Sequence, residues 1–194
     1  MNGYLAIVPS IAFPSLNEQD THEVSVSSGQ DPREGRARAT FQLERAYLDE
    51  QDKRVRWGEN FYIKVMLPQV SKPLYLTSTV KSFYTHTWSS RAQQVFFSFN
   101  KTHDCLWKFE WPDYNYRMEM EFKVVNPGDE GILTHIQTGN HLCVESDPHL
   151  IHRYISLTVR SEYGVEAGVV CHSVKELRIR NEKGHNVFSL SVNA

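Results

Sequence analysis

A pattern of alternating apolar and polar positions recurs along the chain at a fixed spacing. Residues 6–10, 74–78 and 142–146 all have the order apolar, any residue, apolar, any residue, serine. The serines are Ser10, Ser78 and Ser146, so consecutive copies are 68 residues apart. Alternation with period two predicts a β-strand, and a fixed spacing predicts a structure made of repeated units. The sequence therefore predicts three copies of one β-rich unit.

The segments around these strands repeat as well. Each of the last two copies opens with a glycine turn that leads into an apolar β-type run, and further strands follow in every copy. The opening runs are residues 58–65 and 128–136, the middle strands are 24–26, 95–99 and 169–174, and the closing strands are 41–43, 107–111 and 187–190. Four strands in each of three units predict an all-β fold, namely a β-trefoil with a closed barrel and capping hairpins.

The predicted trefoil forms one domain over residues 1–194, with lobes at 1–50, 51–124 and 125–194 and with long loop insertions. The first lobe lacks its opening strand, because only residues 1–3 precede the first repeated segment. Three interpretations stay open at this point. Another chain completes the barrel, its rim is left open, or the natural start lies upstream.

Two connecting segments differ from the strands in composition. Residues 9–38 are rich in proline, glycine and serine, and they end in a basic trio formed by Arg33, Arg36 and Arg38. This composition is typical of a loop, apart from the short strand at 24–26.

The second segment, residues 112–127, alternates large apolar side chains with polar ones. The apolar members are Tyr114, Tyr116, Met118, Met120 and Phe122, and Arg117 lies among the polar ones. The alternation favours a strand that extends a sheet edge. The alternative is that the segment presents its aromatic side chains to a partner.

Charge and composition exclude several classes of partner. The chain has 21 basic and 23 acidic residues, so its net charge of −2 gives no general attraction to nucleic acid or to an anionic membrane. No apolar run approaches the length of a membrane helix and no secretory signal is present, which predicts a cytosolic protein. Cys105, Cys143 and Cys171 are odd in number, and we expect reduced, buried thiols.

The search for chemistry predicts no enzyme, no cofactor and no metal site. Phosphate loops, nucleophile elbows, zinc-protease motifs and CxxC pairs are absent from the sequence. One region gathers candidate metal ligands, but their spacing matches no closed zinc site. These residues are His135, His141, Cys143, Asp147, His149 and His152.

A lectin-like or other ligand-binding trefoil is the alternative function. Trp57, Trp88 and Tyr154 are candidates for sugar-stacking aromatics, although no matching aromatic and polar set repeats in the other lobes. Trp107 and Trp111 share a strand face with Phe109, which predicts a place in the core.

The order of several pieces resembles the cilia- and flagella-associated protein 161 family. The matching pieces are residues 55–61, 74–78, 94–96, 185–190, the step from 35–36 to 40–41 and, above all, 163–172. Together they span nearly the whole chain, from Gly3 to Leu190.

The resemblance implies a structural protein without catalytic residues. Members of that family are microtubule inner proteins of the ciliary and flagellar axoneme, and their fold resembles the trefoil-type MIR modules. The implied partners are α/β-tubulin of the doublet microtubule and other inner proteins, and the implied location is the tubule lumen. Near-zero net charge suits that location, because the acidic tubulin tails project outward. We expect contacts from the two connecting segments, through Arg33, Arg36, Arg38, Tyr114, Tyr116 and Arg117.

Overall fold

Strands dominate the structure, which confirms the all-β prediction. The computed structural model describes residues 4–8, 21–27, 39–47, 52–67, 71–79, 93–145, 158–161, 164–172 and 186–190. The strands are β1 (Tyr4–Val8), β2 (Thr21–Ser27), β3 (Gln42–Arg45), β4 (Asn60–Val65), β5 (Leu74–Thr79), β6 (Gln93–Ser98), β7 (Leu106–Glu110), β8 (Glu130–His135), β9 (His141–Glu145), β10 (Thr158–Ser161), β11 (Gly164–His172) and β12 (Val187–Ser189). Short helical turns are η1 (His103–Cys105), η2 (Tyr114–Tyr116) and α2 (Arg117–Met120).

The described parts of the three repeated segments all form strands, as predicted; residues 9, 10 and 146 lie outside the described residues. They lie in β1, β5 and β9, and each of these strands forms an antiparallel pair with a later strand: β1 with β2, β5 with β6, and β9 with β11. The strand predicted at residues 24–26 is present and is longer than predicted: β2 extends from Thr21 to Ser27. The pair of β10 and β11 was not predicted from the sequence.

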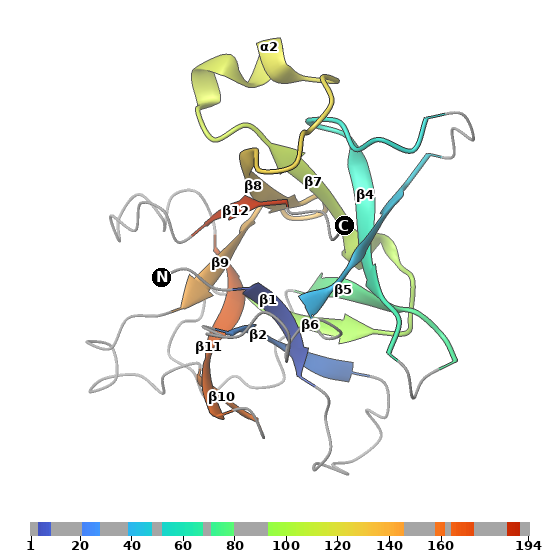
Figure 1. Ribbon diagram of the computed structural model, residues 1–194, viewed down its shortest axis with the longest axis vertical. Helices are drawn as coiled ribbons and strands as arrows, with labels where there is room; N and C mark the ends of the chain where they lie inside the picture. The colour runs from blue at the N-terminus through green and yellow to red at the C-terminus, as the bar shows by residue number, and fades with distance from the viewer. Residues whose placement is uncertain are drawn as a thin grey trace.

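Strand pairing forms a closed circuit. The sheet runs in the order β6, β5, β4, β7, β8, β9 and β11, and β11 then pairs with β6 and β2 (Figure 1). β3 also pairs with β4, and β12 pairs with β8. Pairing alone does not divide the chain into lobes, so the boundaries at 50/51 and 124/125 stay a prediction.

Large aromatic side chains fill the interior of this sheet. Trp57, Phe61, Phe97, Trp107 and Phe109 are each at most 1% exposed. The Trp107 indole N–H donates to the Leu76 carbonyl at 2.9 Å, so its polar atom is satisfied in the core. The predicted core positions of Trp107 and Phe109 are confirmed, whereas Trp111 is only partly buried and packs at the core margin.

The cysteines and the turn glycines match their predictions. Cys105, Cys143 and Cys171 are buried free thiols, and burial raises the pKa of Cys171 to about 12, which keeps that thiol protonated. Gly58 and Gly128 have φ angles of +76° and +89°, a backbone conformation that favours glycine, and they precede β4 and β8.

Candidate functional site

Residues 112–122 form a helical cap between β7 and β8, so the edge strand predicted for residues 112–127 is wrong over most of its length, and Val124 alone forms an antiparallel bridge, with Arg56. The Asp113 carboxylate accepts a hydrogen bond from the Asn115 backbone N–H at 2.9 Å, which starts the turn η2. α2 follows directly, at the top of the view in Figure 1. Period-two alternation over so few residues specifies a strand only when a neighbouring strand is available, and the described strands do not pair with this segment.

The cap exposes an apolar surface, as in the alternative interpretation of the sequence. We call its four large exposed side chains the cap surface: Tyr114, Tyr116, Met118 and Phe122, with exposed fractions of 78%, 53%, 87% and 62%. Met120, in contrast, turns inward and packs against the core. Tyrosine, phenylalanine and methionine are the residue types enriched at protein interfaces.

A rigid base holds the cap in place. The Phe122 N–H donates to the Trp57 carbonyl at 2.9 Å, and the Trp57 N–H donates to the Lys123 carbonyl at 2.9 Å. The Arg56 guanidinium donates to the Phe122 carbonyl at 2.8 Å. Phe122 has a φ angle of +63°, which is strained for a bulky side chain. The base therefore fixes an aromatic residue in an unfavourable backbone conformation while its ring remains in solvent.

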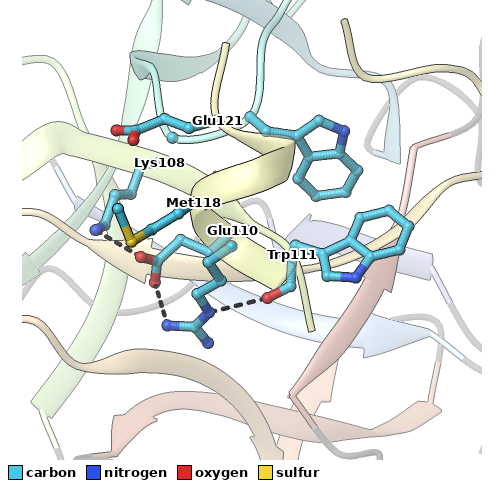
Figure 2. Close-up of a pocket in the computed structure, with 8 residues that line it drawn as sticks. Lys108, Glu110, Trp111, Met118 and Glu121 are labelled. Carbon is cyan, nitrogen blue, oxygen red and sulfur yellow. Dashed lines mark hydrogen bonds and ion pairs between the residues drawn. The ribbon is translucent and has the colours of Figure 1, made fainter. Parts of the chain in front are cut away.

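A shallow hollow of about 130 Å³ lies beside the cap (Figure 2). Its lining comes from the turn before β4, from β7 and from the cap itself: Trp57, Gly58, Lys108, Glu110, Trp111, Arg117, Met118 and Glu121. Within the described part of the chain, the Trp57 indole nitrogen has no hydrogen-bond partner.

Glu110 organises the polar side of this hollow. Its carboxylate pairs with the Lys108 ammonium at 2.6 Å and the Arg117 guanidinium at 3.4 Å, and it accepts a hydrogen bond from the Thr134 hydroxyl at 2.5 Å. Burial acts to raise the pKa of Glu110, but the hydrogen bonds from Lys108 and Thr134 and the charge of Arg117 lower it overall. The carboxylate is therefore ionised at neutral pH and links β7 to β8 and to the cap.

Arg117, which the sequence predicts as a contact residue, is tied to the body of the fold by its hydrogen bonds. Its Nε donates to the Trp111 carbonyl at 2.9 Å, and its guanidinium lies 5.5 Å from the centre of the Tyr114 ring. With its other nitrogen on Glu110, this side chain holds the cap on β7 and is only 23% exposed. The structure thus exposes Tyr114 and Tyr116 to solvent, and Arg117 lies beneath the Tyr114 ring with less of its side chain exposed.

Several other predicted site residues lie outside the described residues: Arg33, Arg36, Arg38, Trp88, Asp147, His149, His152 and Tyr154. Trp57, the remaining lectin candidate, is 1% exposed and stacks on Phe109 with ring centroids 4.8 Å apart. It does not offer a ring face for a sugar to stack on. No local pattern predicts this burial, because a tryptophan before a glycine turn fits either the core or the surface.

Two of the described histidines, His135 and His141, are buried inside the protein. His135 has Thr138 Oγ1 at 2.9 Å from Nδ1 and the Asp104 carbonyl at 3.0 Å from Nε2. His141 is 5% exposed. Among the described residues, no three potential metal ligands converge, and none of the helices there has the length and apolar character needed to cross a bilayer.

We expect the stability of the protein to fall in mild acid. Burial lowers the pKa of His135, and burial with the Arg117 charge lowers that of His141 to about 4. An unfolded histidine titrates near pH 6.5, so the unfolded chain binds more protons between about pH 6.5 and 4. The melting temperature should therefore be nearly constant between about pH 7 and 8 and decrease from pH 6.5 downwards.

His141→Gln should flatten this pH profile, and His103→Gln is the matched control because His103 is exposed. Melting curves of the three proteins at closely spaced pH values measure the effect. A wild-type profile that is level from pH 7 to 4.5 would contradict the assignment of neutral, buried imidazoles.

Comparison with known proteins gives two kinds of similarity. No family model matches the chain. Cilia- and flagella-associated protein 161 of Bos taurus is 26% identical over 132 residues, which cover 68% of this chain and 38% of that protein. The protein of the same name in Mus musculus is 29% identical over 119 residues, covering 61% of this chain and 36% of the relative. The chain therefore aligns with less than two fifths of the length of these relatives.

Solved structures share the fold. The SDF2-like protein of Arabidopsis thaliana superposes with a TM-score of 0.59 over 98% of this chain and 90% of its own, at 15% identity. A Caenorhabditis elegans protein of unknown function gives a TM-score of 0.53 over 87% and 79% of the two chains, at 13% identity. At such identities the similarity concerns the fold alone. The sequence similarity, in contrast, is to proteins whose names associate them with cilia and flagella.

Proposed function

We propose that this chain is a structural protein of cilia and flagella, and that its cap surface binds a protein partner. The observation that carries the proposal is the group of four large side chains that are 53–87% exposed on a fixed base. Isolated apolar side chains on a surface are ordinary, but a cluster of aromatic and methionine residues supported by a strained backbone is typical of a binding surface. The names of the two curated relatives support the location.

The proposed partner is the luminal wall of the doublet microtubule, formed by α/β-tubulin and other inner proteins. The near-neutral charge of −2 agrees with a surface recognised by shape and apolar contact rather than by a basic patch. A modest contact area suffices on a lattice, because neighbouring contacts along a filament act together. We propose no catalytic activity and no cofactor for this chain.

The proposed fold is an incomplete β-trefoil. Support comes from the repetition of the pairings: the antiparallel pairs β1–β2, β5–β6 and β9–β11 repeat, and β3–β4 corresponds to β7–β8. In such a fold the apolar side chains of the strands pack in the core. Connecting segments such as the cap are therefore the elements that are free to contact a partner protein.

Replacing Met118 by glutamate should release the protein from axonemes. The side chain is 87% exposed, so a carboxylate there leaves folding nearly unchanged, within about 0.5 kcal/mol. In an interface, however, this carboxylate would be buried without a charged partner. The burial would weaken the binding free energy by about 2 kcal/mol or more, which is a loss of over tenfold in affinity. Salt extraction of doublets from ciliated cells that express the tagged variant measures retention.

Two further variants separate binding from folding. Met66→Glu is the matched control, because Met66 is 49% exposed but lies outside the cap, and it should leave retention unchanged. Phe122→Gly removes the ring and suits a φ angle of +63°, so it should maintain or increase stability while weakening retention. Equal extraction of wild type, Met118→Glu and Phe122→Gly would refute the role of the cap. A wild-type protein that does not co-sediment with doublets would refute the ciliary function itself.

A further inference from the structure

The hollow beside the cap opens on a surface that the proposed partner covers. Met118 belongs both to the lining of the hollow and to the cap surface, and it is 87% exposed. All of the lining residues lie in the described part of the chain, and the folded chain leaves the hollow open (Figure 2). Its volume of about 130 Å³ exceeds the roughly 30 Å³ of one water molecule, so the hollow can admit the end of a side chain.

Two cations share one carboxylate on the polar side of the hollow. Lys108 and Arg117 both pair with Glu110, at 2.6 Å and 3.4 Å, and they contact different oxygens of its carboxylate. The Thr134 hydroxyl donates to one of these oxygens as well, so the hydrogen-bonding capacity of Glu110 is largely used. Neither cation forms an ion pair with a second carboxylate among the described residues. Two positive charges against one negative charge leave this group with a surplus of one positive charge.

The cations of this group are also its more exposed members. The side chains of Lys108 and Arg117 are 32% and 23% exposed, whereas that of Glu110 is 13% exposed. A lysine has three N–H donors, of which Glu110 takes one here, and an arginine has five, of which Glu110 and the Trp111 carbonyl take two. The group therefore offers the hollow positively charged donors rather than an acceptor.

We infer that this hollow binds an aspartate or glutamate side chain of the protein that covers the cap surface. The partner carboxylate accepts hydrogen bonds from Lys108 and Arg117, and its aliphatic stem contacts Met118 and the half-buried Trp111. The inference rests on the proposed function, because it names the chemistry by which the same partner is recognised. The cap surface supplies apolar contact, and the hollow fixes the position of one charged group beside it.

Glu121 acts against an incoming carboxylate and gives the inference a second sign to test. It lines the hollow, its side chain is exposed, and it forms no ion pair with the other described residues. Water and salt screen an exposed charge more strongly than a partly buried one, so Lys108 and Arg117 outweigh it. Neutralising Lys108 should therefore weaken binding of an acidic partner, whereas neutralising Glu121 should strengthen it.

The dipeptide N-acetyl-leucyl-glutamate amide is a suitable probe, because its leucine suits the apolar cap and its carboxylate suits the hollow. The glutamine analogue, N-acetyl-leucyl-glutamine amide, lacks only the charge. In nuclear magnetic resonance titrations of the full chain, the acidic dipeptide should shift the backbone signals of Lys108 and Trp111 saturably. It should bind at least about threefold more tightly than the glutamine analogue at low salt.

Three variants test which charges are responsible. Lys108→Gln should abolish the preference for the acidic dipeptide, and Glu121→Gln should increase its affinity by about twofold or more. Lys64→Gln is the matched control, because Lys64 is 25% exposed and pairs with Glu44 on a strand in the same way but lies outside the hollow. This control should leave both affinities unchanged.

The same variants on doublets separate the inference from the proposed function. Where wild type is retained and Met118→Glu is released, Lys108→Gln should be extracted at lower salt than wild type and Lys64→Gln should not. Equal binding of the two dipeptides, an unchanged preference in Lys108→Gln, or weaker binding of the acidic dipeptide by Glu121→Gln would overturn the inference even when retention supports the function. A dimer that Lys108→Gln abolishes would overturn it too, since the occupant would be a second copy. A wild-type protein that does not bind doublets counts against the function, and the titrations then decide whether the hollow binds a carboxylate.

Discussion

Replacement of Trp107 by alanine is expected to lower the free energy of unfolding by about 3–5 kcal/mol. Trp107 is 0% exposed on β7, the strand that connects β4 with β8. Its ring packs 5.1 Å from that of His135, and its N–H satisfies the Leu76 carbonyl. The substitution removes the apolar contact, opens a cavity and leaves a buried carbonyl without its donor.

Equilibrium denaturation by urea measures this loss. The stability of Trp107→Phe should lie between those of the wild type and Trp107→Ala, because phenylalanine retains most of the apolar volume but cannot donate the hydrogen bond to the Leu76 carbonyl. Tyr47→Ala is the matched surface control, since Tyr47 is 73% exposed and should change stability by no more than about 0.5 kcal/mol. A loss below about 1 kcal/mol for Trp107→Ala would contradict the position of this ring at the centre of the sheet.

The second large effect is expected at Gly131, which has no room for a side chain. A Cβ atom there would lie 2.5 Å and 2.7 Å from two carbons of the Phe109 ring and 2.7 Å from a carbon of Trp57. These two rings are stacked and buried, so neither is free to move away. Gly131→Ala should therefore destabilise the protein by about 1–3 kcal/mol, and Gly131→Val by more.

A double-mutant cycle tests the cause. In the background of Phe109→Leu the ring no longer occupies this space, so Gly131→Ala should cost less than it does in the wild type. Gly139→Ala is a useful control: Gly139 has a φ angle of +67° and open space around it, so its cost reflects backbone conformation alone. Additive effects of Gly131→Ala and Phe109→Leu would show that steric contact with this ring is not the reason.

The sequence predicted most of the strands correctly because their signals are local. The repeated segments lie in β1, β5 and β9, and the turn glycines Gly58 and Gly128 precede β4 and β8. The prediction failed at residues 112–122, where alternation indicated a strand and the structure has a cap. The Asp113 side chain accepts a hydrogen bond from the Asn115 backbone N–H and so favours a turn. This local preference for a turn is not visible in the alternation of apolar and polar residues, which favours a strand.

The candidate site was predictable only in part. Tyr114 and Tyr116 were recognised as residues that a partner could contact, and both are exposed. The role of Glu110 was missed, because its partners Thr134 and Arg117 become neighbours only when β8 and the cap pack against β7. Likewise, Arg56 and Phe122 are 66 residues apart in the chain, but in the fold the Arg56 guanidinium donates a hydrogen bond to the Phe122 carbonyl.

The sequence by itself determined where most of the described strands and their glycine turns form, since alternation of side chains and the conformational freedom of glycine act over a few residues. Only the tertiary structure decided which aromatic side chains lie in the core and which remain in solvent: Trp57 is buried by its stacking on Phe109, whereas Phe122 is held outside. It also decided that β7 has two neighbouring strands and that β3 and β12 have one each within the described residues. The physical reason is that burial and strand pairing depend on contacts between distant segments, which no local pattern encodes.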